Sequence, residues 1–569
     1  MKSTLHLFLV TIALFFTSCT QETPLSKNQP TFKTTIIHIN DHHSHIDADS
    51  IALKVEGEEI KAKIGGFANV VSKIKALQKS VHNPITLHAG DALQGTMYYT
   101  LFKGEVDAKV MNQITWDAFT LGNHEFDDGD RELNKFLKAL KAPILSANVI
   151  ASPLSPLYRK WQPYRIITRQ GQRIAIIGLD VSFKTKHSSR PSKHISFLDE
   201  IKTVQKYVKE IEAMGVNKII LLSHFGFNKD QKLAKVVSGI DVIIDGDSHT
   251  LLGEFDMVGL KSQGDYPTLV KSKNSEPICI AQAWQYSYVV GKLHVAFDKD
   301  GVISECKGTP TLLLNTTKNP KLIKVASQHP QIEIVQPDTQ TTKLISKYQK
   351  ELKSKKKQII VTSKAYIGHN RIPNDRADGI TALPYGSDIA PLIAKAYYLK
   401  SSRANCCIQN AGGVRSGLKK GKISIDDVYK LLPFSNTLIE LSMSGKEIKG
   451  VLEDALNAVF ERGSTGAFPY GYAIRYDIDS TRPKGKRVSN IEILDKTTNK
   501  FIPLDMKKEY VVVANSYIAE GRDGYGGFKG VAKRVDTYFD YAMSFSDMIK
   551  KDKQVEPLSR EYHPIKSFR

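Results

Sequence analysis

The sequence has few cysteines, no long hydrophobic segment after its N-terminus, and no internal repeat or low-complexity tract. Only 5 of its 569 residues are cysteine, and no two of them have the CxxC spacing of a zinc site or a thioredoxin-like redox motif. No segment after the N-terminus is apolar for long enough to predict a transmembrane helix. These absences argue against a thiolate metal site, a repeat protein and a membrane-spanning protein.

The four cysteines beyond residue 19 have two different expected roles. A bridge between Cys279 and Cys306 is compatible with an exported chain, but the sequence cannot assign the pairing. The adjacent Cys406 and Cys407 would point to opposite faces of a strand. We therefore expect this second pair to be packing residues rather than a redox site.

The N-terminus has the layout of a secretory signal peptide. An apolar stretch from Leu5 to Phe16 is followed by Thr-Ser-Cys ending at Cys19, which resembles a bacterial lipobox except that phenylalanine stands at the usual leucine position. We assign residues 1–19 to the signal peptide and 20–31 to a polar tether, and we expect a lipid on Cys19. The chain would then be exported to the cell envelope, periplasmic or surface-exposed, with its lipid anchor in the outer membrane. A free cysteine in a cleaved signal peptide is the alternative.

The net charge of +21 invites a nucleic-acid interpretation. The lysines are scattered, however, and no basic helix is interleaved with aromatic residues, so we expect no nucleic-acid polymer as a partner. A basic surface also attracts small phosphorylated molecules into a cleft. The charge therefore favours anionic ligands without identifying one.

Short apolar runs alternate with helical patterns along most of the chain, which predicts an α/β fold. We divide it into a first α/β domain over residues 32–335, a linking helix over 336–357, and a second α/β domain over 358–569. The run Tyr286 to Phe297, followed by a turn sequence that ends at Gly301, predicts a hairpin that closes the first domain.

Residues able to bind metal follow five predicted strands. The clusters are Asn40-Asp41-His42-His43, Gly90-Asp91, Gly122-Asn123-His124-Glu125, Ser223-His224 and Asp247-Ser248-His249. A single aspartate or histidine after a strand is more often a turn residue, but the carboxyl ends of strands in α/β folds line one crevice, where five clusters can converge. If the backbone stays extended, Asp41 and His43 share one face, as do Asp247 and His249. Such donors suit two divalent ions, for example Zn²⁺ or Mn²⁺.

The five clusters resemble the motifs of a known enzyme family. "INDHHSH", "AGDALQGT", "LGNHEFDDG", "LLSHFG" and "GDSHT", in this order, are similar to the metallophosphoesterase domain of the 5′-nucleotidase family, which includes bacterial UDP-sugar hydrolases and NAD-nucleotidase-like members. "NAGGVRSG", "LPFSNTL" and "YIAEGRDGYGGF" continue the match into the second domain. The resemblance implies a four-layer α/β/β/α first domain, joined by a helix to an α/β nucleotide-binding domain.

The resemblance also implies roles for the clustered residues. One metal ion would be held by Asp41, His43, Asp91 and His249, and the other by Asp91, Asn123, His224 and Asp247. His124 would stabilise the phosphoryl transition state and Asp127 would orient His124, whereas Glu125 would support its loop. The family often has histidine where Asp247 stands, and we expect this departure to add negative charge and to favour harder metals such as Mn²⁺.

In the second domain the resemblance implies a pocket for the nucleoside end of the substrate. Phe434 and Tyr517 would sandwich the base, and Asp523 would accept hydrogen bonds from the ribose. Arg415 would bind phosphate oxygens, and Asn410 and Asn436 belong to the same motifs. The segment from Ile367 to Gly386 departs from the family pattern. Within it, Arg371 and Arg376 are both candidate phosphate ligands; the alternative is that they are ordinary surface arginines.

The function implied by the resemblance is release of phosphate from nucleoside 5′-monophosphates, extended to the pyrophosphate of UDP-sugars or NAD. Alternatives are a 2′,3′-cyclic-nucleotide phosphodiesterase and 3′-nucleotidase, or a non-catalytic nucleotide-binding lipoprotein. Because metals and base pocket would belong to different domains, we expect a rotation between the domains during turnover. No obligate protein partner is expected.

Overall fold

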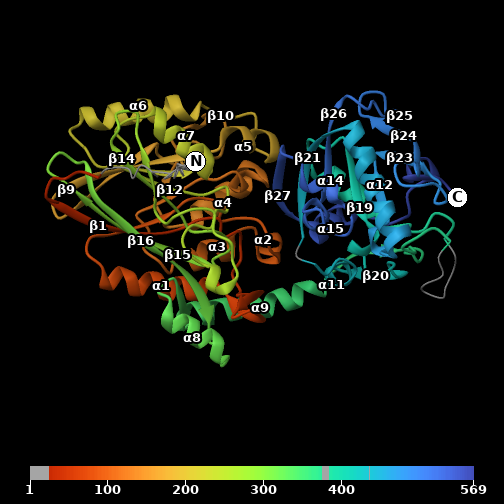
Figure 1. Cartoon of the computed structure of the whole chain (residues 1–569), viewed down its shortest axis with the longest axis horizontal. Helices are drawn as coiled ribbons and strands as arrows, with labels where there is room; N and C mark the ends of the chain where they lie inside the picture. Colours follow the sequence, from red (N-terminus) through yellow and green to blue (C-terminus); the bar gives the residue numbers. More distant parts are fainter. Residues whose placement is uncertain (1–24, 375–382, 435) are drawn as a thin grey trace, which may run out of the picture.

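The computed structural model describes residues 25–374, 383–434 and 436–569, which form two lobes joined by one long helix (Figure 1). The first lobe runs from β1 (Phe32–Ile39) to β17 (Ile332–Val335), and the second from β18 (Ile359–Ser363) to β28 (Ile565–Phe568). Helix α9 (Thr339–Lys356) connects them. The predicted α/β class is confirmed in both lobes.

Two sheets form the centre of the first lobe. Their other principal strands are β2 (Asp49–Val55), β3 (Glu58–Ile64), β4 (Pro84–His88), β5 (Ala118–Thr120), β6 (Ile144–Leu145), β8 (Tyr164–Arg169), β9 (Gln172–Asp180), β11 (Ile219–His224), β12 (Val242–Asp245), β13 (Thr268–Lys271), β14 (Pro277–Gln282), β15 (Val289–Phe297) and β16 (Ile303–Asn315). The larger sheet has the order β2-β3-β16-β15-β1-β4-β5-β6, with β17 beside β16, and the smaller has the order β13-β14-β12-β11-β9-β8. Within them, β1-β4-β5-β6 and β9-β11-β12-β14 are parallel runs.

Three apolar cores separate four layers. Ile36, Leu87 and Ile244 belong to the core between the two sheets. Helices α1 (Phe67–Ser80), α3 (Glu105–Met111) and α4 (Gly129–Ala139) cover the outer face of the larger sheet, and α6 (Glu200–Ala213) and α7 (Phe227–Val236) cover that of the smaller. Strand β11 is buried along its whole length, which explains its uninterrupted apolar run. The α/β/β/α arrangement is therefore confirmed.

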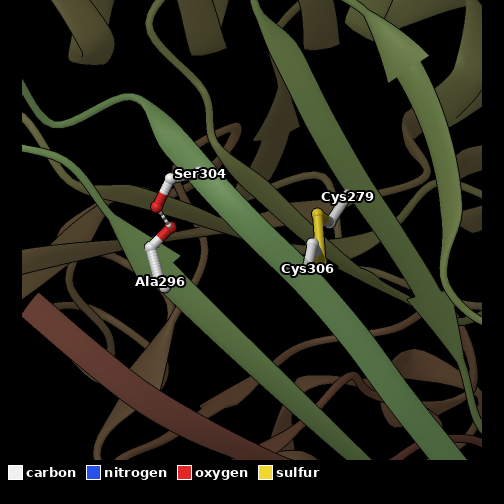
Figure 2. Close-up of a disulfide and its surroundings, with 4 residues drawn as sticks. All are labelled: Cys279, Ala296, Ser304 and Cys306. Carbon is white, nitrogen blue, oxygen red and sulfur yellow. Dashed lines mark hydrogen bonds between the residues drawn. A yellow bond between two sulfur atoms is a disulfide. The ribbon is translucent and has the colours of Figure 1, made fainter. Parts of the chain in front are cut away.

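A disulfide links the two sheets of the first lobe. Cys279 in β14 and Cys306 in β16 are bonded (Figure 2), whereas the sequence had left their pairing open. Strands β15 and β16 form the predicted antiparallel hairpin, in which Ser304 Oγ donates to Ala296 O over 3.3 Å. The hairpin lies within the larger sheet, and the disulfide joins its strand β16 to β14 of the smaller sheet.

The second lobe is built on a five-stranded sheet and a four-stranded sheet. The first has the order β22 (Pro469–Tyr472), β19 (Cys406–Asn410), β26 (Glu509–Asn515), β21 (Thr437–Ser444) and β27 (Arg534–Asp540), and the second β25 (Lys500–Pro503), β24 (Val488–Asp495), β23 (Ile474–Ile478) and β28. Helices α10 (Ile389–Lys400), α12 (Gly445–Arg462) and α15 (Tyr541–Asp552) pack on these sheets around one apolar core. Cys406 and Cys407 are buried in this core as free thiols, as expected.

Helix α9 belongs structurally to the first lobe. The side chain of Asp338 accepts the backbone N–H of Thr341 and caps the helix start. Ile345 and Tyr348 are buried against the first lobe, while lysines fill the last turn. No helix in the described ranges is both long and apolar enough to cross a membrane.

Candidate active site

The five predicted clusters meet at one edge of the first lobe. Asp41 and His43 follow β1, Asp91 follows β4, and Asn123 and His124 follow β5 in the larger sheet. His224 ends β11, and Asp247 and His249 follow β12 in the smaller sheet. Since all five strands are parallel members of their sheets, their carboxyl ends lie on the same side. All seven predicted metal-binding side chains are buried or nearly buried there.

The local backbone differs from the extended geometry that we expected. Asp41, His43, Asp91, Asp247 and His249 all have positive φ values, between 46° and 68°. Left-handed backbone is costly for residues with a Cβ atom and is retained where the surroundings enforce it. Here the loops support one another, because the N–H groups of Asp41 and His43 donate to the carbonyls of Gly90 and Asp91. The paired donors thus converge through tight turns, and the expected alternation of an extended strand was wrong.

Three imidazoles present the same nitrogen to the centre of the site. Nδ1 of His43 lies 3.1 Å from Leu93 O, Nδ1 of His224 lies 2.6 Å from Ala89 O, and Nδ1 of His249 lies 2.5 Å from Gln285 Oε1. Because each acceptor is an oxygen, each Nδ1 donates its proton to it, and each Nε2 is directed toward the centre of the site. This is the orientation of histidines that bind a metal through Nε2.

The donor atoms fall into two overlapping groups. Asp41, His43 and His249 form one, and Asp41, Asp91 and His224 form the other, with the potential ligand atoms of each within 4.8 Å of one another. Asp91 Oδ2 lies 2.9 Å from His224 Nε2 and 3.8 Å from His43 Nε2, so Asp91 also lies between the two groups. Both side-chain polar atoms of Asn123 are buried without a hydrogen-bond partner in the described structure. The residues therefore fit a bound divalent metal.

The charges at the site also fit bound cations. Burial holds the pKa of His43 well below its ordinary value, which keeps its imidazole neutral as a ligand must be. Burial alone would lower the pKa of His224, but Asp91 and Asp41 raise it well above the ordinary value. The buried carboxylates thus attract positive charge, which metal ions would supply.

His124 and its neighbours form a second part of the site. His124 Nδ1 lies 2.6 Å from Asp127 Oδ2, while its Nε2 is buried and has no hydrogen-bond partner among the described residues. Burial lowers the pKa of His124, but Asp127 and Asp91 outweigh it and raise the pKa above the ordinary value. The Glu125 carboxylate accepts the backbone N–H groups of Asp91, Ala92 and Gly122, and so ties two site loops together. Glu125 therefore supports the loops.

Two residues at the site were not found from the sequence. Lys184 of α5 (Ser182–Ser188) places Nζ 2.6 Å from Asp247 Oδ1. Tyr538 of β27 reaches across from the second lobe: its ring is stacked on His43 at 4.4 Å between centroids, and its hydroxyl lies 3.2 Å from His249 Nδ1. Neither residue lies in a recognisable motif, because each reaches the site only through the tertiary fold.

The second lobe contains a separate cavity of about 430 Å³. Seven predicted residues line it: Arg371, Asn410, Arg415, Phe434, Asn436, Tyr517 and Asp523. Arg376 lies outside the described residues. The loop Gly463–Gly466 also lines the cavity and was missed, although its Gly-Ser-Thr-Gly sequence after a helix was a turn signal. None of the lining residues comes from the first lobe, so the predicted nucleoside pocket is a separate site from the predicted metal site in the first lobe.

The cavity combines flat apolar faces with fixed polar groups. Phe434 and Tyr517 are 43% and 47% exposed, so both rings are accessible to a ligand. Asp523 accepts Asn410 Nδ2 at 2.9 Å and Ser464 Oγ at 3.0 Å, which fixes a carboxylate that still has free lone pairs. The guanidinium of Arg415 lies 5.7 Å from the Phe434 ring centroid, and Arg371 donates to Thr465.

Comparisons with known proteins agree with this architecture. Residues 34–251 match the calcineurin-like phosphoesterase family, and residues 374–530 match the 5′-nucleotidase C-terminal domain. The chain is 40% identical to the NAD 5′-nucleotidase of Haemophilus influenzae over 98% of this chain and 96% of that one.

Solved structures extend the likeness to three dimensions. The structure of Haemophilus influenzae NAD nucleotidase has a TM-score of 0.89 at 40% identity and covers 94% of this chain and 99% of its own. A 5′-nucleotidase precursor from Thermus thermophilus has a TM-score of 0.57 at 34% identity, with 95% and 100% covered. The chain therefore belongs to the 5′-nucleotidase family, with a metallophosphoesterase first lobe, and it is a metal-dependent hydrolase.

Proposed function

We propose that the protein releases phosphate from nucleoside 5′-monophosphates and also cleaves the pyrophosphate bond of NAD or UDP-sugars. The observation that carries this proposal is the pairing of a buried donor site for metals with a cavity in which two exposed rings, Phe434 and Tyr517, lie near the fixed carboxylate of Asp523. Aromatic rings can stack on any of the bases, and a carboxylate can accept hydrogen bonds from the ribose hydroxyls. The relative named NAD 5′-nucleotidase supports the dinucleotide part.

The residues of the first lobe would perform the phosphoryl chemistry. We propose two metal ions, with Asp41, His43, Asp91 and His249 at one and Asp91, Asn123, His224 and Asp247 at the other. When bound, they would supply Lewis-acid chemistry that polarises a phosphoryl oxygen and lowers the pKa of a water. His124 would donate a hydrogen bond from Nε2 to the phosphoryl group, since Asp127 holds Nδ1 and favours the protonated ring.

The second lobe would bind and orient the nucleoside end of the substrate. Arg415 and Arg371, which both line the cavity, would bind phosphate oxygens through their planar guanidinium groups. Because the cavity has no residue from the first lobe and Tyr538 covers His43, the lobes must move relative to each other before a bound nucleotide meets the donor site.

Phosphate release from AMP, NAD, UDP-glucose and 2′,3′-cyclic AMP tests the proposal, with Mn²⁺ or Zn²⁺ and with a chelator. We expect hydrolysis of AMP and at least one dinucleotide substrate, abolished by the chelator. A preference for 2′,3′-cyclic AMP would favour the cyclic-phosphodiesterase alternative. The absence of hydrolysis with any substrate and either metal would leave only a nucleotide-binding role.

A Phe434→Ala variant serves as the control for the nucleoside pocket in the same assay. It should raise KM for AMP, because one stacking face, worth about 1–3 kcal/mol per base, is removed. Hydrolysis of p-nitrophenyl phosphate, which has no nucleoside, should change little. Equal losses with both substrates would contradict a base-binding role for Phe434.

We also propose that the chain is exported and held at the outer membrane by a lipid on Cys19, which lies outside the described residues. The disulfide between Cys279 and Cys306 supports export, because such bonds persist in oxidising compartments. Membrane fractionation of cells that express the wild type and Cys19→Ser checks this. The wild type is expected with the membranes and the variant in the soluble fraction; a soluble wild type would contradict lipidation.

A further inference from the structure

Lys184 places a positive charge inside the candidate active site. Its side chain is 15% exposed, and its ammonium lies 2.6 Å from Asp247 Oδ1, which is itself 4.0 Å from His224 Nε2. A lysine ammonium is strongly hydrated, so burying it requires a nearby opposite charge. Asp247 provides this charge and keeps the ammonium at the edge of the donor set.

The ring of Tyr538 marks a space that Lys184 shares with three histidines of the candidate active site. The ring centroid of Tyr538 lies 4.4 Å from that of His43, 5.0 Å from that of His124 and 4.7 Å from that of His249. Lys184 Nζ lies 5.6 Å from the same Tyr538 centroid. One flat group from the second lobe is therefore bordered by three imidazoles and one ammonium. The lobe movement required for turnover would withdraw this ring.

A phosphoryl group that reaches the site must enter the same space. It has to approach His124 Nε2, which is buried and unpartnered in the described structure, and that imidazole borders the Tyr538 ring. A group seated there lies within reach of Lys184, because the lysine side chain is flexible and its three N–H donors rotate freely. The carboxylates of Asp41, Asp91 and Asp247 make the surroundings negative, so an incoming phosphate needs positive charge beyond that of the metals.

We propose that Lys184 binds the phosphoryl group of the substrate, exchanging its contact with Asp247 for one with a phosphate oxygen. This inference rests on the proposed phosphohydrolase function, to which it adds a substrate-contacting residue. In the resting enzyme Asp247 holds the ammonium; with substrate bound, the phosphate offers more negative charge than a single carboxylate.

The same short helix provides a matched control. Lys186 lies two residues further along α5, where its Nζ is 3.4 Å from Phe197 O and 5.6 Å from the Phe197 ring centroid. It contacts none of the donor residues in the described structure. Lys184→Met and Lys186→Met therefore remove the same charge from the same helix at two different places.

Binding of inorganic phosphate to the Mn²⁺-saturated full chain tests the proposal by calorimetry. We expect Lys184→Met to weaken phosphate binding at least tenfold and to lower kcat/KM for AMP by about 100-fold, as for other lost transition-state donors. Lys184→Arg should restore most phosphate binding, and Lys186→Met should resemble the wild type. Thermal unfolding shows whether each variant is folded, and Lys184→Gln replaces Lys184→Met if the latter is not.

Two results would overturn the proposal. The first is wild-type phosphate affinity in folded Lys184→Met. The second is loss of phosphate binding that accompanies loss of Mn²⁺ binding, measured by metal titration, because Lys184 would then only balance the charge of Asp247. Phosphate titration needs no nucleotide turnover, so a wild type that binds phosphate but hydrolyses no nucleotide would refute the proposed function alone.

Discussion

Replacement of Asp91 by asparagine is expected to lower kcat/KM for AMP by about 10³-fold or more and to reduce the metal content of the protein. Asp91 lies between the two donor groups, with Oδ2 2.9 Å from His224 Nε2 and 3.8 Å from His43 Nε2. Bound metals stabilise a phosphoryl transition state by several kcal/mol, and each 1.36 kcal/mol corresponds to about tenfold in rate. The measurements are steady-state kinetics and metal analysis of the purified variant.

The asparagine should not unfold the metal-free protein. Its side-chain oxygen can still accept the backbone N–H of His124, which donates to Asp91 Oδ1 over 2.8 Å in the wild type. The substitution also removes negative charge near Glu125, whose pKa is raised to about 7 by burial and by Asp91. Thermal unfolding in the presence of a chelator checks this.

Asp117→Asn is the control for the loss of a carboxylate. Asp117 precedes β5, and is paired with Arg169 at 2.5 Å, so it lies at the opposite end of that strand from Asn123. We expect near-normal activity and metal content. An Asp91→Asn enzyme that retained full metal content and activity would contradict the assignment of Asp91 to the metal site.

Linking the two lobes in the arrangement of Figure 1 is expected to reduce turnover of AMP at least 100-fold. The nucleoside cavity has no lining residue from the first lobe, and Tyr538 covers three histidines of the candidate active site, namely His43, His124 and His249. A nucleotide bound in the cavity therefore cannot present its phosphate to His124 until the lobes move. Arg190 and Lys400 suit the link, because Arg190 Nη2 donates to Lys400 O over 3.3 Å across the lobes.

The experiment uses Arg190→Cys with Lys400→Cys in a chain that starts after Cys19, joined by a short bismaleimide. The unlinked double variant and each single variant treated with the reagent should remain active, since neither side chain belongs to the donor site or lines the cavity. Turnover of the linked enzyme at the unlinked rate would show that catalysis needs no movement between the lobes.

The sequence predicted much of the fold because local patterns and long-range packing agree there. The strands that precede the site, such as β11 and β12, contain continuous apolar runs, which are typical of strands that are buried on both faces. The hairpin β15–β16 and helix α9 carried equally clear signals, and the structure places them within a few residues of the expected bounds. The β2–β3 hairpin was missed, although apolar and polar residues alternate along both of its strands and a glycine, Gly57, lies between them.

The metal donors converge through turns as well as through their position at the ends of strands. Their position after parallel strands was correct, but the side chains of Asp41 and His43 are directed by left-handed turns. Such turns are disfavoured locally for residues with a Cβ atom. They persist because the loop after β1 bonds to the loop after β4, which a single-sequence pattern does not reveal.

The sequence by itself determined the α/β class, the strand-end clusters, and the residue types suited to metals and to a base. The tertiary structure decided which atoms face inward, because the acceptors that fix His224 and His249 are Ala89 O and Gln285 Oε1, distant along the chain. It also brought Lys184 to Asp247 and Tyr538 to His43. These contacts join residues that are 36 or more positions apart, so they depend on how sheets, helices and lobes pack and not on any local pattern.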